Sequence, residues 1–306
     1  MSSGWNTIDS DAGLFTRLIE KLGVKNIQFE DLYSIDSESI AQLSPVYGVI
    51  FLFKYSKIDR QIAKNGNAPI TGEYDLSYQE NDIFFGNQTI QNACGTQAVI
   101  NILLNQEIDL GEELSNFKSF VGGFDGEMIG ETISNSDLIR SVHNSFSTPN
   151  LIVDEDPNPP PEDSDDKNDG LFHFIGYIHK NGFIYELDGL KNYPIKHDEC
   201  KDMDDFITKI PQVLMKRIAK YGNELRFSCL VITNDKLNQA KDLGDEEMKY
   251  QELNKRKIWD KEIELRQHDY TNLFVNMIKG ISSKLDDQQW EALLDKARER
   301  TKAKFK

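Results

Sequence analysis

Four residues have the types and the order that thiol-dependent hydrolysis requires: Gln88, Cys94, His173 and Asp188. Cys94 opens an apolar helix predicted over 93–104, and N–H groups at a helix start favour the reactive thiolate. A small buried side chain without a chemical role is the simpler alternative for a lone cysteine. The amide of Gln88 could join the Cys94 backbone N–H in stabilising an oxyanion, although glutamine before a helix is common.

A predicted β-hairpin places the histidine and the aspartate. Two β-rich runs cover 171–178 and 183–189, and Asn181-Gly182 lies between them. Asn-Gly between apolar runs is a strong signal for a two-residue turn. If these residues form the turn, Lys180 faces Phe183 and the register of the whole hairpin follows.

That register brings His173 and Asp188 to one face of the sheet. Ile175 is then opposite Asp188, and His173 lies two positions from Ile175 on the same face. Diagonal neighbours of this kind are roughly 7–8 Å apart, which is within reach of their side chains. The aspartate could then orient the imidazole toward a thiol, which is the task of the third member of a catalytic triad.

The other histidines fit this role less well. His179 shares the face but lies at the turn, about 20 Å along the strand at roughly 3.3 Å per residue. His143, on a predicted polar helix, and His197, in a predicted loop, have no obvious carboxylate partner in the pattern. A purely structural role remains the alternative for His173.

Length and charge bound the organisation of the chain. The 306 residues predict one large α/β domain followed by a smaller module. Residues 236–306 hold 16 Lys and Arg against 14 Asp and Glu, a balance of +2, which leaves 19 against 37, a balance of −18, for residues 1–235. The acidity behind the net charge of −16 therefore belongs to residues 1–235. An acidic surface disfavours nucleic acid and favours a basic partner, although it could serve solubility alone.

The cysteines and the apolar runs indicate the compartment. Three cysteines, Cys94, Cys200 and Cys229, show no paired spacing, so we expect no disulfide framework, no metal centre and no cofactor. The start of the chain lacks the pattern of a signal peptide, and the longest apolar run, Val46 to Phe53, is too short to span a membrane. These features predict the cytoplasm and the nucleus.

The remaining patterns predict the elements that position the site. Residues 47–55 are apolar on both faces, which is typical of a central strand. A last strand is predicted over 224–233, a surface loop over 56–81, and helices over 14–22, 112–121, 136–146 and 202–221, the last interrupted at Pro211. The acidic, proline-rich segment 147–170 is predicted to be mobile.

After residue 236 only helices are predicted. The segment 245–268 is highly charged, and an amphipathic stripe runs from Tyr270 to Ile281. Asp286 and Gln289 resemble a capping box that opens a final helix. Such stripes usually pack within the fold, but a small helical module has little core of its own, so an external partner is plausible.

The chain resembles the ubiquitin C-terminal hydrolase family over about 1–235. The resemblance rests on Trp5 to Phe15, on Phe-Phe-Gly-Asn-Gln-Thr-Ile-Gln-Asn-Ala-Cys-Gly-Thr-Gln over 84–97, on His173-Phe174, and on Glu186-Leu187-Asp188-Gly189-Leu190. It implies a papain-like α/β (α+β) fold with a knotted chain path, in which a central, mostly antiparallel sheet is flanked by helices. An all-α extension over 236–306 would follow this catalytic domain.

The resemblance also implies an activity and a role for each site residue. Cys94 would be the nucleophile, His173 the general base and acid, Asp188 the group that orients His173, and Gln88 the oxyanion donor. The chain would be a thiol-dependent deubiquitinating hydrolase that cleaves bonds at the C-terminal glycine of ubiquitin. Residues 147–170 would form a crossover loop through which the substrate threads.

The C-terminal residues indicate which branch of the family the chain resembles. Residues 261–270 and the basic end resemble the proteasome-associated members, whose helical extension docks on a ubiquitin-receptor subunit of the proteasome and, in some organisms, on a chromatin-remodelling complex. We therefore expect 245–306 to bind such a subunit. Two alternatives stay open: a non-catalytic ubiquitin-binding scaffold anchored by its tail, and a general papain-like protease that cleaves unfolded peptides.

Overall fold

The computed structural model describes residues 4–147, 172–222 and 226–304. Its strands form one antiparallel sheet in the order β1-β7-β2-β4-β5-β6-β3. Their bounds are β1 Ile27–Leu32, β2 Val46–Lys54, β3 Glu73–Tyr74, β4 Phe172–Lys180, β5 Phe183–Leu187, β6 Ile195–Glu199 and β7 Phe227–Asn234. The predicted central strand is confirmed, because β2 pairs with β7 on one side and with β4 on the other.

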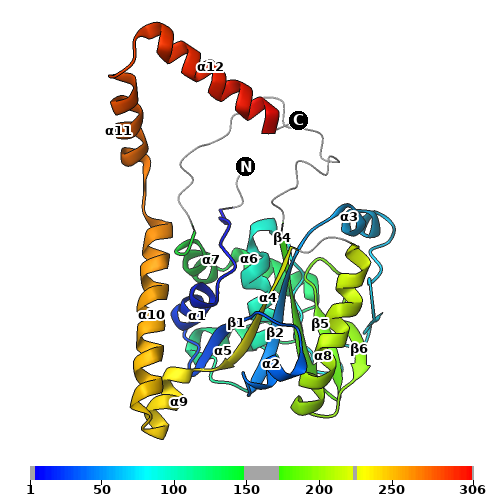
Figure 1. The fold of residues 1–306 in the computed structure, drawn as a ribbon. Coiled ribbons are helices and arrows are strands. Elements are labelled where there is room, and N and C mark those ends of the chain that lie inside the picture. Colours follow the sequence, from blue (N-terminus) through cyan, green and yellow to red (C-terminus); the bar gives the residue numbers. More distant parts are fainter. Residues whose placement is uncertain (1–3, 148–171, 223–225, 305–306) are drawn as a thin grey trace.

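Helices cover both faces of the sheet (Figure 1). One face packs against α1 Ala12–Lys21, α4 Cys94–Leu103, α5 Gly111–Phe120, α6 Gly126–Asn135 and α7 Asp137–Asn144. The other face packs against α2 Ser37–Ala41 and α8 Met203–Ile218. Alternate residues of a strand supply the two cores: on β2, Ile50 belongs to the first, whereas Val49 and Phe51 belong to the second.

The predicted hairpin register is confirmed. Lys180 pairs with Phe183, and the ladder continues to Gly176 and Leu187. Both turn residues have positive φ, 49° at Asn181 and 78° at Gly182, as a type I′ turn requires. The ladder ends before Asp188, which is the first residue after β5.

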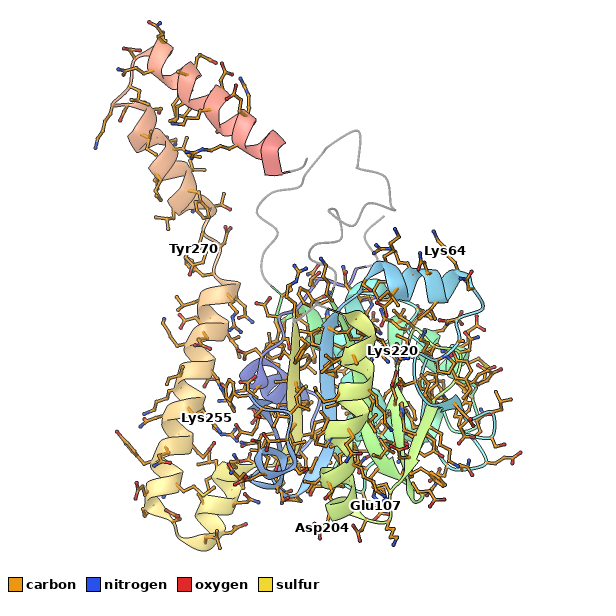
Figure 2. The ribbon with its side chains drawn as sticks, turned by 45° about the vertical axis from the view of Figure 1, so that its right-hand side comes forward. Lys64, Glu107, Asp204, Lys220, Lys255 and Tyr270 are labelled. Carbon is orange, nitrogen blue, oxygen red and sulfur yellow. The ribbon has the colours of Figure 1, made fainter. Side chains whose placement is uncertain are left out.

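The helices after the last strand fall into two groups. α9 Lys236–Leu243 and α10 Glu246–Gln267 run beside the body, whereas α11 Thr271–Ser282 and α12 Asp287–Lys304 extend away from it (Figure 1). Figure 2 shows the same division, with Lys255 on α10 beside the body and Tyr270 beyond it at the start of α11. The predicted capping box of α12 is present, because the Gln289 N–H donates to Asp286 Oδ1 at 2.8 Å and Asp286 N–H to Gln289 Oε1 at 3.2 Å.

The loop predicted after β2 and the helix break predicted at Pro211 are both wrong. Residues 57–64, predicted as loop, form α3 Lys57–Lys64, which begins with a capping box between Ser56 and Asp59 and is tied to the body by the Tyr221 hydroxyl. Pro211 lies inside an unbroken α8, although an interior proline costs about 3 kcal/mol. Burial of Ile210, Leu214 and their neighbours against the sheet offsets that cost.

The pattern also missed several elements, namely β1, β3, β6, α2 and α6. α6 begins at Gly126 and contains Gly130, two residues that weaken a helical pattern, and the structure gives the reason for the second glycine. A Cβ at Gly130 would lie 1.9 Å from the carbonyl oxygen of Asn87, so close contact with that segment requires glycine.

Some expectations lie beyond what the structure describes. The predicted crossover loop over 147–170 falls, except for Ser147, outside the described residues. The chain path that would make a knot includes this segment, so the knot stays a prediction. Among the helices of the described segments, none has both the length and the apolar content needed to cross a bilayer.

Candidate active site

Cys94 is the first residue of α4 and follows a short 3-10 turn, η1 Gln91–Ala93. Its side chain is half-buried, whereas the rest of α4 is buried beneath β4. The next residue is glycine because space is short: a Cβ at Gly95 would lie 3.0 Å from the ring of Phe15 and 3.6 Å from that of Phe174. This close packing fixes the helix start, and with it the position of the thiol.

His173 lies on β4 and is bound from two sides. Its Nε2 is 2.7 Å from Asp188 Oδ1, and its ring also shares a hydrogen bond with Cys94. Because Nε2 faces the carboxylate, Nδ1 is the nitrogen left for the thiol. The structure thus brings together the three residues that the sequence predicted as cysteine, histidine and aspartate of one site.

Aromatic rings hold the imidazole in place. Phe53 and Tyr55 both contact it edge-on, with ring centroids 5.7 and 6.1 Å away. The side chain of His173 is only 4% exposed and that of Asp188 only 3%. The hydrogen bond between them is therefore shielded from water, which strengthens it.

His173 and Asp188 each stabilise the ionised form of the other. Burial alone would lower the pKa of His173, but the charge and hydrogen bond of Asp188, with a further contribution from Cys94, raise it to about 9. Burial alone would raise the pKa of Asp188, but His173 and the nearby Arg217 and Lys191 lower it to about 2. At neutral pH the site therefore holds an imidazolium beside the thiol and a carboxylate behind it.

Gln88 lies in a segment that is tied to the aspartate. Its backbone N–H donates to the carbonyl of Gly189 at 2.7 Å, directly after Asp188. A Cβ at Gly189 would lie 2.9 Å from that of Gln88, so glycine permits this close approach. The backbone of the predicted oxyanion donor is thus fixed relative to the His173–Asp188 pair.

Buried amides of α4 and of the turn that follows it position the same segment, and the sequence analysis missed them. Gln97, Asn101 and Asn105 bind the backbone of Gly86 and Phe84 through hydrogen bonds of 2.8–3.1 Å. All three are at most 4% exposed. Their spacing of four residues, from an otherwise apolar helix into the turn after it, was the signal, because buried amides must find hydrogen-bond partners.

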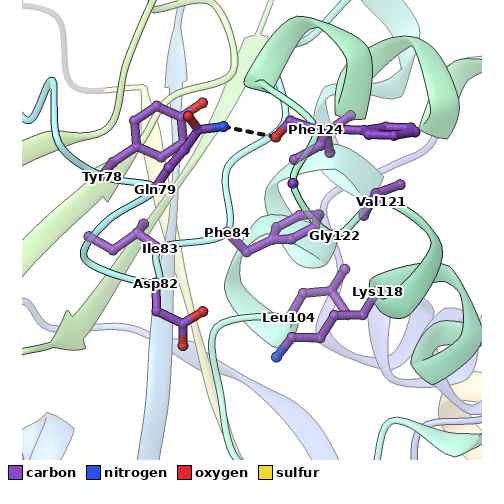
Figure 3. A pocket seen from close by; sticks show the side chains of 12 residues that line it. Tyr78, Gln79, Asp82, Ile83, Phe84, Leu104, Lys118, Val121, Gly122 and Phe124 are labelled. Atoms are coloured by element: carbon purple, nitrogen blue, oxygen red, sulfur yellow. Dashed lines mark hydrogen bonds between the residues drawn. The ribbon is translucent and has the colours of Figure 1, made fainter.

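A cavity of about 480 Å³ opens beside the thiol. Its walls come from the N-terminal segment, from β2 and β4 and from the start of α4, and include Ile8, Asp9, Ser10, Leu52, Cys94 and Phe174. A chain end that enters this cavity would reach the sulfur. A second cavity, of about 340 Å³, lies between the loop around Ile83 and the α5–α6 connection, where Gln79 donates to the carbonyl of Phe124 (Figure 3). No cysteine or histidine lines that second cavity.

The other cysteines and histidines lie elsewhere. Burial raises the pKa of Cys200 to about 11 and that of Cys229 to about 12, so both stay protonated thiols. His143 is buried beside Thr96, and burial lowers its pKa. One expectation needs correction: His197 lies on β6, not in a loop, and its Nε2 does have a carboxylate partner, Glu186, at 3.0 Å.

Metal coordination finds no support within the described ranges, where no three His, Cys, Asp or Glu side chains gather closely enough to hold an ion.

Residues 5–219 match the family described as ubiquitin carboxyl-terminal hydrolase, family 1. The chain belongs to this family. It is 40% identical over 305 residues to ubiquitin carboxyl-terminal hydrolase 2 of Schizosaccharomyces pombe, with 96% of each chain covered. It is 36% identical over 361 residues to isozyme L5 of Dictyostelium discoideum, covering 99% of this chain and 98% of the other.

Solved structures agree with this assignment. The UCH37 catalytic domain of Trichinella spiralis, bound to ubiquitin vinyl methyl ester, is 34% identical with a TM-score of 0.62, covering 76% of this chain and 96% of the other. UCH37 of the same organism in the same complex is 30% identical with a TM-score of 0.61, covering 86% and 99%. As a member of the hydrolase family, the chain is a cysteine-type deubiquitinase with the ubiquitin carboxyl-terminal hydrolase fold.

Proposed function

We propose that Cys94, His173, Asp188 and Gln88 carry out hydrolysis at the C-terminal glycine of ubiquitin. The observation that carries the proposal is the buried imidazole of His173, hydrogen-bonded to Cys94 on one side and to Asp188 on the other. Nucleophile, base and orienting carboxylate in this order are what acyl transfer through a thiol requires.

Each residue has one task in the proposed reaction. The Cys94 thiolate attacks the glycine carbonyl, and the Gln88 amide with the Cys94 N–H stabilises the oxyanion that forms. His173 gives its proton to the leaving amine or thiol as the C–N or C–S bond breaks. His173 then takes a proton from water, which attacks the thioester and releases the ubiquitin carboxylate and the free thiol.

Ubiquitin with a C-terminal electrophile tests the nucleophile. The wild-type protein is expected to form a covalent adduct that adds the mass of one ubiquitin, because the thiolate is trapped by the electrophile. Cys94→Ala is expected to form none, while Cys200→Ala, which removes a buried thiol, reacts as the wild type does. An adduct that persists in Cys94→Ala would contradict the assignment.

A fluorogenic ubiquitin amide separates an enzyme from a ubiquitin-binding scaffold. Turnover by the wild type, lost in Cys94→Ala, is the expected result, whereas binding without turnover would favour the scaffold. A fluorogenic peptide without the ubiquitin fold is the matched control for a general papain-like protease. We expect no cleavage of that peptide.

We also propose that the C-terminal helices dock on a ubiquitin-receptor subunit of the proteasome. In support, α11 presents six apolar side chains that are each 40–55% exposed: Leu273, Phe274, Val275, Met277, Ile278 and Ile281. An exposed apolar stripe of this kind fits the groove of a partner protein. Its place beyond α10 would leave the cavity at Cys94 open to substrate.

The structure indicates which residues to delete in a test of docking. The expected docking segment, 245–306, includes α10, and α10 packs on α1, so removing all of it would also damage the body. Deletion of 271–306 is expected to abolish co-purification with proteasomes and to leave hydrolysis of the ubiquitin amide unchanged. Retained co-purification would contradict the proposal.

The compartment is the last part of the proposal. Docking on proteasomes places the protein in the cytoplasm and the nucleus, and the three free cysteines suit a reducing environment. Imaging of the fluorescently tagged full chain tests this, and exclusion of the tagged protein from both compartments would contradict it.

A further inference from the structure

A buried arginine lies behind the catalytic pair. Arg217 comes from α8, on the opposite side of the sheet from α4, and is 1% exposed. Its Nη1 donates to Glu186 Oε1, and its Nη2 is 3.8 Å from Asp188 Oδ2. A guanidinium is rarely buried this completely unless its charge is used, so its position calls for a reason.

The two carboxylate oxygens of Asp188 have different partners. Oδ1 accepts from His173 at 2.7 Å and from the backbone N–H of Leu190 at 3.0 Å. Oδ2 faces Arg217. The charge of the arginine thus attracts the carboxylate from the side that His173 does not reach.

The same guanidinium also supports the imidazole through an aromatic ring. It lies over the ring of Phe53, 4.7 Å from its centroid, and the Phe53 ring meets His173 edge-on at 5.7 Å. Arg217 therefore acts on both members of the pair. It attracts Asp188 by its charge, and it supports His173 through the ring of Phe53.

Among the described residues, Glu186 binds Arg217 and does not contact His173 or Asp188 through a hydrogen bond. It is fully buried, and its second oxygen accepts from Tyr177 and His197 at 3.0 Å each. This leaves Arg217 as the cation that separates two buried carboxylates, Glu186 and Asp188. Without it their repulsion would favour protonation of one of them.

We propose that Arg217 is a positioning residue of the hydrolase, which keeps Asp188 ionised and aimed at His173. This inference rests on the roles proposed for His173 and Asp188. Arg217 does not line the cavity at Cys94, so it acts on the chemical step and not on the binding of ubiquitin.

The experiment measures hydrolysis of a fluorogenic ubiquitin amide by Arg217→Gln, with rates divided by the number of active sites titrated with the electrophilic ubiquitin. We expect kcat to fall tenfold or more at unchanged KM. Arg217→Lys is expected to recover part of the rate, because it keeps the charge and loses the planar fork.

Two measurements distinguish a positioning role of Arg217 from a purely stabilising one. The acid limb of the pH–rate profile is expected to move to higher pH in Arg217→Gln, because Asp188 is then protonated more easily. The groups that face Asp188 in that titration are His173 on β4, Glu186 on β5, Lys191 after β5, Arg217 on α8, and Tyr55 and Tyr74. The low-field proton resonance of the His173–Asp188 hydrogen bond is expected to shift as well.

Arg256→Gln is the matched control. Arg256 is also buried and ion-paired, with Glu20 at 2.8 Å and Asp235 at 2.9 Å, but it lies on α10 away from the site. It is expected to lower the unfolding temperature without moving the acid limb or the low-field resonance.

The outcomes distinguish this inference from the proposed function. If Asp188→Asn is inactive while titrated Arg217→Gln keeps the wild-type kcat, acid limb and resonance, the inference about Arg217 is overturned and the site assignment stands. If Asp188→Asn is fully active, the proposed roles themselves fail. The double variant Glu186→Gln/Arg217→Gln, which removes both charges, is expected to recover stability but not kcat, and recovery of kcat would overturn the positioning role.

Discussion

At the scale of single residues, the proposed chemistry depends on which nitrogen of His173 meets which partner. Nε2 lies 2.7 Å from Asp188, so the carboxylate sets the orientation of the ring and leaves Nδ1 for Cys94. The orientation comes from outside the strand, because Asp188 follows β5, accepts a hydrogen bond from the Leu190 N–H and is attracted by the charge of Arg217. A catalytic histidine held in this way loses little freedom when the substrate arrives.

Asp188→Asn tests the orienting role. The amide has nearly the same shape but can offer its NH₂ group to Nε2, so the imidazole would present the wrong tautomer to the thiol. We expect kcat to fall by about 10²- to 10⁴-fold with little change in KM. Steady-state hydrolysis of a ubiquitin amide is the measurement, and a loss of less than threefold would contradict the role.

The raised pKa of His173 predicts a pH dependence of stability. Its pKa is about 9 in the folded protein, against an ordinary 6.5 when unfolded, so the stabilisation is present in full below pH 6.5 and is lost as pH rises through 9. The difference corresponds to about 3 kcal/mol. Urea unfolding at pH 6.5 and at pH 9.5 measures it.

His173→Gln is the control for this pH dependence. Between pH 6.5 and pH 9.5 the unfolding free energy of the variant is expected to fall by about 3 kcal/mol less than that of the wild type. The reason is that the variant lacks the titrating imidazole. Equal drops in the two proteins would show that other groups cause the loss.

At the scale of elements, α10 is attached to α1 through a tight seam. Trp259 of α10, which is 9% exposed, lies on Gly13 of α1. Arg17 binds Asp260 through two hydrogen bonds of 2.7 and 2.9 Å, and Arg266 reaches Asp11 at 3.1 Å. Because Asp11 also caps α1, α10 supports the segment that leads to the cavity at Cys94.

A double-variant cycle tests the seam. A Cβ at Gly13 would lie 2.3 Å from Cγ of Trp259, so Gly13→Ala is expected to destabilise the wild type by about 1–3 kcal/mol. In a Trp259→Ala background the space is open, and the same change is expected to be neutral or to stabilise by up to about 1 kcal/mol, since alanine favours helix. Urea unfolding of the four proteins gives the coupling, and additive effects would contradict close packing.

At the scale of the whole molecule, the packed body of the protein extends further along the chain than the family match does. The family match ends at residue 219, yet β7 is in the sheet and α10 is packed on α1. Among the helices and strands of the described residues, only α11 and α12 stand apart from the body (Figure 1). This arrangement favours a boundary near residue 270, later than the predicted start of the extension at 236.

Two truncations test where the body ends. A chain that stops at residue 270 is expected to keep the unfolding temperature and the kcat of the full chain, because α11 and α12 add no core to it. A chain that stops at residue 244 loses Trp259 and the ion pairs of Arg256 and Arg266, and is expected to unfold several degrees lower. Equal thermal unfolding of the two chains would contradict the seam.

At the hairpin, the local structure was determined by the sequence alone. Asn181-Gly182 sets a turn because both residues tolerate positive φ, and the register from Lys180 to Gly176 follows from that turn. His173 and Asp188 are 15 residues apart and belong to one hairpin, so their meeting was predictable.

Only the tertiary structure decided which distant groups meet. Cys94 reaches His173 because α4 packs under β4, Arg217 reaches Asp188 because α8 covers the other face of the sheet, and Trp259 finds Gly13 across almost the whole chain. No local pattern encodes such contacts. They depend on the order of strands in the sheet and on the fit of buried side chains, which exist only when the whole chain has folded.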